Sequence, residues 1–220
     1  MKIKQIVTNN NVSLLIKSFS LTFFYLLGIF ITISLFNYYP FKDGSFLNIN
    51  NLITLFFRWD SLHYQQIVIN GYDKINSVFF PLYPILVKIL SYITGPLWSG
   101  FLISWVFLAL SIFIFYKILV LKYADEKSRQ RTIALLLFSP FALFFTAYYT
   151  ESLFIFLLLF FFYSLQKKNW LIASMVAFLA CLTKNIGIFL LPVYLFEYWQ
   201  NYKTKKGSLG INKKIIKSGR

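Results

Sequence analysis

The densest run of polar and ionisable residues in this chain extends from Arg58 to Tyr72, and Asp60 stands near its start. The 220 residues include only seven aspartates and glutamates, so a carboxylate in such a run is unusual. A carboxylate with a suitable pKa can act as a general base toward a hydroxyl group. Asp60 is therefore the first candidate for a catalytic residue.

The neighbours of Asp60 allow both structural and functional interpretations. A short helix is expected to begin at Asp60 and to end at Gly71, so Asp60 could simply be an N-cap that accepts free amide hydrogens. His63 follows one helical turn later, a spacing that would suit a shared divalent metal or a proton relay. A hydrogen-bonding role within the helix is the favoured alternative for His63. Arg58 could bind a phosphate and Trp59 could lie at the membrane interface, where anchoring is the simpler role of both.

Two further charged residues, Glu151 and Lys184, lie beside apolar runs. Charges near membrane depth are costly and usually have a partner or a function. Glu151 and Lys184 could pair with each other. Alternatively, they could line an outward-facing cavity, in which carboxylates handle a hydroxyl and the lysine stabilises charge on a phosphate.

The composition predicts an integral membrane protein. Hydrophobic residues make up 58% of the chain, aromatic residues 21%, and the mean hydropathy is +0.65. Long apolar runs of this kind favour membrane-spanning helices, because lipid cannot satisfy exposed backbone polar groups. The net charge of +15 could suggest nucleic-acid binding. The basic residues lie between apolar runs, however, which favours contacts with membrane lipids and predicts no nucleic-acid partner. The single cysteine, Cys181, excludes an internal disulfide and a cysteine metal cluster.

We predict an all-α polytopic bundle of about six or seven membrane helices. The clearest apolar runs cover about 18–36, 101–120, 132–147, 152–165, 170–182 and 186–199. The run at 132–147 is interrupted by Ser139-Pro140, and 79–94 is expected to be a partial or tilted element. Residues 1–200 would form one transmembrane domain with an outer loop at about 37–78, which carries short juxtamembrane helices. Residues 201–220 would form a basic cytoplasmic tail.

The positions of lysine and arginine predict an orientation. Placing the basic clusters on the cytoplasmic side puts 17 of the 22 lysines and arginines there. Asp60, Glu151 and Lys184 then lie on the opposite face of the membrane, although they are far apart in sequence.

Three stretches resemble the PIG-V mannosyltransferases, that is, the GPI mannosyltransferase II enzymes and their prokaryotic relatives. The first is similar to that family's first luminal loop and comprises Arg58-Trp59-Asp60, His63-Tyr64, Gly71-Tyr72 and Phe79-Phe80-Pro81-Leu82-Tyr83-Pro84. The second comprises Phe138-Ser139-Pro140 and Tyr148-Tyr149-Thr150-Glu151-Ser152-Leu153-Phe154. The third is Leu182-Thr183-Lys184-Asn185-Ile186-Gly187. The family more often has arginine where this chain has Lys184, so the charge is kept and the bidentate fork is lost.

The resemblance implies a GT-C glycosyltransferase fold with its active site on the non-cytoplasmic face. It also implies a polyprenyl- or dolichyl-phosphate-linked sugar donor, commonly of mannose. Asp60 would be a catalytic base or a metal-binding carboxylate, and Glu151 would line the same cavity. The expected substrate-binding residues are Arg58, Trp59, His63, Tyr64 and Lys184. The membrane would be the plasma membrane in a prokaryote and the ER membrane in a eukaryote.

One departure from the family concerns length, because its members are usually about twice as long as this chain. The chain could therefore be a truncated form, half of a split enzyme, or a non-catalytic membrane subunit that requires a partner chain. A small transporter that uses Glu151 and Lys184 as pathway charges is a third alternative.

Overall fold

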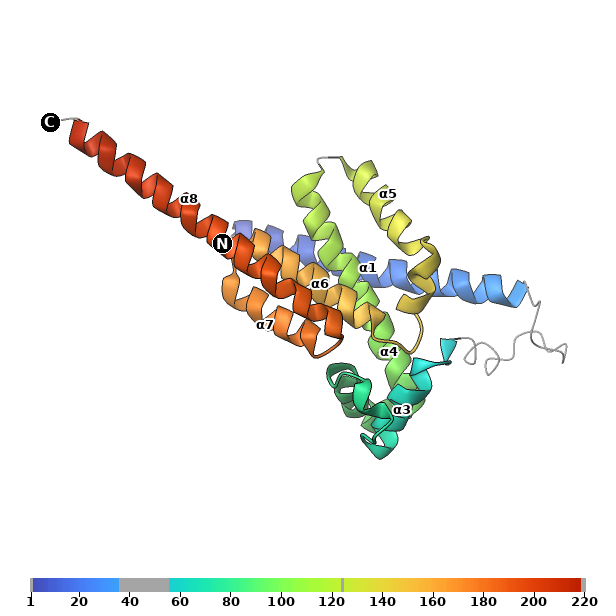
Figure 1. The fold of residues 1–220 in the computed structure, drawn as a ribbon. Helices are drawn as coiled ribbons and strands as arrows, with labels where there is room; N and C mark the ends of the chain where they lie inside the picture. Colours follow the sequence, from blue (N-terminus) through green and yellow to red (C-terminus); the bar gives the residue numbers. More distant parts are fainter. Residues whose placement is uncertain (1, 36–55, 124, 219–220) are drawn as a thin grey trace.

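The computed structural model describes residues 2–35, 56–123 and 125–218. Within these ranges the regular structure is helical and includes no strand (Figure 1), which confirms the predicted all-α class. The first part of the predicted outer loop, up to residue 55, lies outside the described residues.

Two of the described helices are long and apolar enough to cross a membrane. They are α1 (Lys2–Leu35), through its stretch Asn11–Thr32, and α4 (Leu82–Lys122). About 20 residues of α-helix cross the hydrocarbon layer, so each helix has the required length. These two helices support a membrane protein, and the predicted number of six or seven spans remains a prediction.

Helix α4 is sharply bent at Gly95. This glycine has φ 78° and ψ 159°, a backbone conformation that glycine adopts without a steric penalty. Pro96 follows and lacks a backbone N–H, so the helical hydrogen-bond ladder is interrupted at the same place. Residues 82–94 therefore form a separate arm, which packs against α3 (Asp60–Asn70). This bend agrees with the prediction of a distinct element at 79–94.

The apolar run at 132–147 is interrupted at Ser139–Pro140, as the sequence predicts. The chain forms α5 (Glu126–Leu137) and then the 3₁₀ helix η2 (Pro140–Phe145). Ser139 has an extended backbone, which is the conformation that a following proline favours, and this ends the helix. Helix α5 begins at a regular cap, where Asp125 Oδ2 accepts a hydrogen bond of 2.7 Å from the Ser128 N–H.

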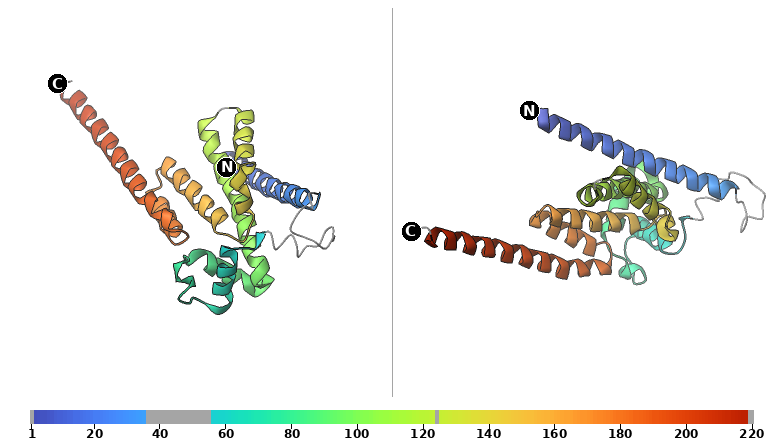
Figure 2. Two further views of the ribbon diagram at one scale, coloured as in Figure 1. Left: turned by 45° about the vertical axis from the view of Figure 1, so that its right-hand side comes forward. Right: turned by 90° about the horizontal axis from the view of Figure 1, so that it is seen from above.

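Among the remaining helices, the middle one packs against both of the others (Figures 1 and 2). They are α6 (Glu151–Gln166), α7 (Trp170–Cys181) and α8 (Leu190–Ser218), and the 3₁₀ helix η3 (Asn185–Phe189) joins the last two. The backbone of α8 continues through the predicted boundary at residue 200 without a break. A core of buried side chains from α3, α4, α6, α7, α8 and the loop before α6 holds these elements together, and includes Val68, Tyr83, Phe101, Tyr148, Leu157, Phe161, Val176 and Leu190.

Candidate active site

The three stretches that resemble family motifs meet in space. Tyr149 Oη, from the second stretch, donates a hydrogen bond of 2.7 Å to the carbonyl oxygen of Arg58, in the first. The backbone N–H of Leu82, also in the first stretch, donates to the carbonyl oxygen of Leu182, in the third, at 2.9 Å. Segments that are separated by about 90 to 100 positions in the chain thus form one junction, which we call the motif junction.

Asp60 is the first residue of α3 and follows a strained turn. Trp59 has φ 50°, which is unusual for a residue other than glycine and costs conformational energy. The turn is fixed by Ser61, whose Oγ donates to the carbonyl oxygen of Arg58 at 2.7 Å and accepts from its N–H at 3.1 Å. The N-cap interpretation of Asp60 was wrong, because Trp59 occupies the cap position and no side chain caps this helix. The exposed Asp60 carboxylate stands in the first turn instead, where the helix dipole favours a negative charge.

Glu151 and Lys184 form an ion pair across the junction. Lys184 Nζ donates to Glu151 Oε1 at 2.6 Å, which confirms the pairing that was one of the two sequence interpretations. Glu151 Oε2 is buried and has no hydrogen-bond partner within the described part of the chain. One oxygen of the carboxylate is therefore held in place while the other remains able to accept a hydrogen bond.

The charges of Asp60 and Glu151 both act on the same two tyrosines, Tyr64 and Tyr149. Burial raises the pKa of Tyr64, on α3, and of Tyr149, in the loop before α6. The negative charges of Asp60 and Glu151 each raise both pKa values further. The two carboxylates thus act on the same pair of phenol groups, so they share one electrostatic neighbourhood.

The other predicted binding residues differ in their exposure. Trp59 is 69% exposed and Arg58 is exposed, so both stand at the surface beside Asp60. Tyr64 is only 6% exposed, and its ring packs edge-on against Phe79 and Tyr83 in the core. Tyr64 therefore stabilises the position of α3 in addition to any contact with a substrate.

His63 is held by a polar network that the sequence did not reveal. Its Nδ1–H donates to Oδ1 of Asn76 at 2.7 Å, and its ring stacks on Phe79. Asn76 is fully buried and donates through Nδ2 to Asp73, whose other carboxylate oxygen accepts the backbone N–H groups of Ile75 and Asn76. This confirms the hydrogen-bonding role that was favoured for His63.

A metal site made by Asp60 and His63 remains a prediction. Among the described residues there is no group of three or more histidine, cysteine, aspartate or glutamate side chains that could hold a metal ion. Because Asn76 occupies Nδ1, the nitrogen of His63 that remains for a metal or a substrate is Nε2.

Close packing at two glycines fixes the motif junction. A Cβ atom on Gly100 of α4 would lie 1.9 Å from Cε2 of Tyr148, so this ring lies directly against the helix backbone. A Cβ atom on Gly187 would lie 2.5 Å from the backbone carbon of Ala180, at the end of α7. Both contacts require glycine. The first holds Tyr148, three residues before Glu151, and the second holds Gly187, three residues after Lys184.

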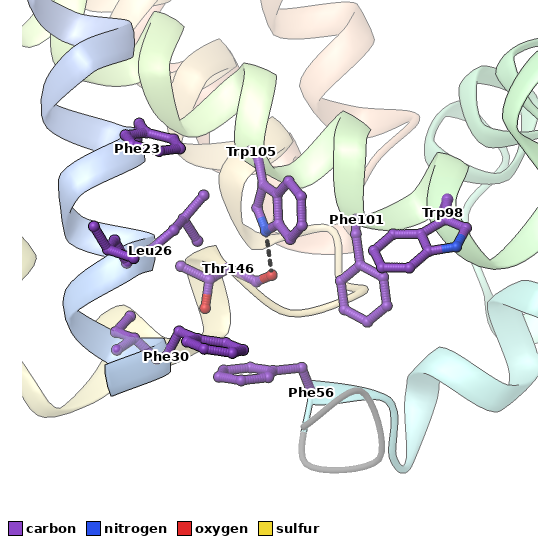
Figure 3. A pocket seen from close by; sticks show the side chains of 10 residues that line it. Phe23, Leu26, Phe30, Phe56, Trp98, Phe101, Trp105 and Thr146 are labelled. Atoms are coloured by element: carbon purple, nitrogen blue, oxygen red, sulfur yellow. Dashed lines mark hydrogen bonds between the residues drawn. The ribbon is translucent and has the colours of Figure 1, made fainter. Parts of the chain in front are cut away.

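An apolar cavity of about 350 Å³ opens beside the junction (Figure 3). It lies between α1 and α4, and its lining includes Phe56 and Thr146, close in sequence to Arg58 and Tyr149. Trp105 Nε1 donates to the carbonyl oxygen of Thr146 at 2.9 Å, which ties this loop to α4. Most of the lining side chains are aromatic or aliphatic, from α1 (Phe23, Leu26, Leu27, Ile29, Phe30) and α4 (Trp98, Phe101, Trp105).

Comparison with known proteins gives one informative similarity. Over 133 residues the chain is 29% identical to GPI mannosyltransferase 2 of Drosophila pseudoobscura pseudoobscura. This similarity supports a mannosyltransferase-like relationship. The match covers 53% of this chain and 29% of the length of that relative. No protein-family model matches the chain, and no solved structure matches it.

Proposed function

We propose that this chain is the catalytic module of a membrane glycosyltransferase with a GT-C-like fold. It would transfer mannose from a polyprenyl- or dolichyl-phosphate donor at the non-cytoplasmic face. The observation that carries this proposal is the Glu151 carboxylate near Asp60. Lys184 holds one of its oxygens, and the other has no hydrogen-bond partner among the described residues. The similarity to a GPI mannosyltransferase supports the choice of mannose.

The residues of the junction suit the two charge changes of such a transfer. The acceptor hydroxyl attacks the anomeric carbon and loses its proton, while the bond from that carbon to the phosphate oxygen breaks. Asp60 is exposed and would take the proton as general base. Lys184 has three donor hydrogens, one of which binds Glu151, so the others can stabilise the charge on the leaving lipid phosphate. Arg58, on the same turn as Asp60, would assist at the phosphate.

The apolar cavity between α1 and α4 supports a lipid-linked donor. Its aromatic and aliphatic lining would accept part of a polyprenyl chain, and it lies beside the loops that carry Arg58 and Tyr149. A donor bound there would place its phosphate at the boundary between the apolar cavity and the polar junction.

The test is transfer of radiolabelled mannose from polyprenyl-phosphate mannose to endogenous lipid acceptors. We expect Asp60→Asn to reduce the rate by about a hundredfold or more, which is the usual contribution of a general base. Glu151→Gln should also reduce the rate, because it weakens the hold on Lys184. The matched control is Glu197→Gln, an exposed acid on α8, which should leave the rate unchanged.

Thermal unfolding of each variant separates loss of chemistry from loss of fold, and full activity in Asp60→Asn would reject the assigned role. A chelator arm tests for a divalent metal.

A second candidate is a non-catalytic membrane module that needs further protein for activity. It is favoured by the coverage of the match, which is 29% of the length of the relative. Under this candidate the isolated chain shows no turnover, and adding a co-purifying membrane chain restores transfer. Turnover by the isolated chain would exclude it.

A further inference from the structure

A second cavity, of about 870 Å³, lies between α1, α4 and α5 at the far end of α6 from Glu151. Lysines from three helices or their ends line it: Lys17 on α1, Lys117 on α4 and Lys167 just after α6. We call it the lysine cavity. The proposed transferase chemistry does not use it.

The positive charge of this cavity lacks a carboxylate partner within the described part of the chain. The acid that lines the cavity is Glu126, which is bound instead by Arg129 at 2.7 Å and by the hydroxyl of Tyr116 at 2.6 Å. Lys117 and Lys167 both lie over the ring of Tyr163, at 5.9 and 5.6 Å from its centroid. The charge of Lys167 therefore acts directly on Lys117, and two like charges are held on one aromatic ring.

The polar residues of the lining gather at the lysine end of the cavity. Helices α1 and α4 run in opposite directions past each other, since Lys17 and Lys117 line this cavity while Phe30 and Trp98 line the first one. At the lysine end the lining combines the polar residues Asn11, Ser13, Tyr116, Gln130 and Tyr163 with the apolar residues Leu14, Val120 and Leu121. Further along the same helices it is apolar and includes Leu21, Ile112, Leu137 and Phe138. A positive end that continues into an apolar groove matches a charged head group with an attached acyl chain.

We propose that the lysine cavity binds an anionic phospholipid. The phosphate would lie between Lys117, Lys167 and Lys17, where it offsets the repulsion between Lys117 and Lys167, and an acyl chain would follow the groove toward Ile112 and Leu137. Lysines near a membrane surface each add to the affinity for anionic lipids. The bound lipid would bridge α1 to the rest of the bundle.

The test measures lipid binding to the full chain in detergent by native mass spectrometry. The probes are phosphatidylglycerol and phosphatidylcholine with identical acyl chains, and glycerol 3-phosphate as a soluble head group. We expect phosphatidylglycerol to bind about tenfold more tightly than phosphatidylcholine, and to raise the melting temperature. Equal affinity for the two lipids would overturn the proposal. Binding of glycerol 3-phosphate as tight as that of phosphatidylglycerol would also overturn it, because it would indicate a free-phosphate site.

Variants locate the binding within the molecule. The double variant Lys117→Gln with Lys167→Gln should lose the preference for phosphatidylglycerol, and Lys117→Arg with Lys167→Arg should retain it. The matched control removes two exposed neighbours, Lys122→Gln with Lys168→Gln, and should keep the preference. Lys17→Gln, at an exposed position of α1, provides a milder variant with about a threefold loss. An unchanged preference in both the double variant and Lys17→Gln would place the lipid elsewhere.

Discussion

The charged residues at the two ends of α6 differ in their partners: at one end they pair with a charge of opposite sign, and at the other they lie beside a charge of the same sign. At its start, Glu151 is bound by Lys184 from the loop after α7, so the two charges of this ion pair neutralise each other. At its end, Lys167 shares the ring of Tyr163 with Lys117, and no carboxylate in the described ranges pairs with either lysine. The charges at the first end are paired within the chain, whereas the second end leaves positive charge for an external anion. The contrast also fits the orientation predicted from the basic clusters.

The two ends also differ in packing. The motif junction is held by backbone hydrogen bonds between distant loops and by contacts that only glycine allows. The lysine cavity, in contrast, is an open space between helices. We therefore expect the junction to tolerate substitution poorly and the lysine end to tolerate it well, and the following predictions test this difference.

The largest effect is expected from Gly187→Ala. The added methyl group would lie 2.5 Å from the backbone of Ala180, and backbone cannot move away as a side chain can. We expect destabilisation of about 3 kcal/mol, typical of overpacking at a rigid contact, and a lower melting temperature in detergent. The control is Gly28→Ala in α1, where the new methyl group meets no atom within 4 Å. This control should be neutral or stabilising by about 0.5–1 kcal/mol, since alanine favours the helix. Equal melting temperatures for both variants would contradict the tight packing of the junction.

A smaller effect is expected from the Glu151–Lys184 pair. A double-mutant cycle of Glu151→Gln and Lys184→Gln measures the coupling between the two side chains in the free energy of unfolding. Because the side chains are 30% and 31% exposed, we expect a favourable coupling of only about 1 kcal/mol. A coupling of zero would show that the pair does not form, and would also remove the basis for placing Lys184 near a phosphate.

The residues of the junction could be predicted from sequence better than their local structure. The polar runs around Asp60, Glu151 and Lys184 were recognisable because acids are rare in this chain. The positions of the basic clusters predicted that these three residues lie on the same face of the membrane. The N-cap interpretation of Asp60 failed because the turn at Trp59 is fixed by a local hydrogen bond from Ser61 and by one from Tyr149, which is distant in sequence.

Other features were missed because they depend on distant contacts. Asp73 and Asn76 look like ordinary loop residues in the sequence, and only the fold brings Asn76 under His63. The break at Ser139–Pro140 in the run at 132–147, in contrast, could be predicted, because a proline disfavours the helical conformation of the residue before it. The lysine cavity combines α1, α4, α5 and α6, and no local pattern indicates which lysines meet.

The smallest effect, and the sharpest test of the comparison, concerns Lys117 and Lys167. The double-mutant cycle of Lys117→Gln and Lys167→Gln cancels what each lysine contributes alone, including its contact with an aromatic ring. What remains is the interaction between the two charges, which should be unfavourable by about 0.3 kcal/mol in detergent without anionic lipid. Its sign is thus opposite to that at the start of α6. Added salt should reduce it toward zero, since exposed charges are screened, and phosphatidylglycerol should turn it favourable if a phosphate lies between the two lysines. A favourable coupling in the absence of lipid would mean that the protein already supplies a counter-charge at this end, and the contrast between the two ends of α6 would then fail.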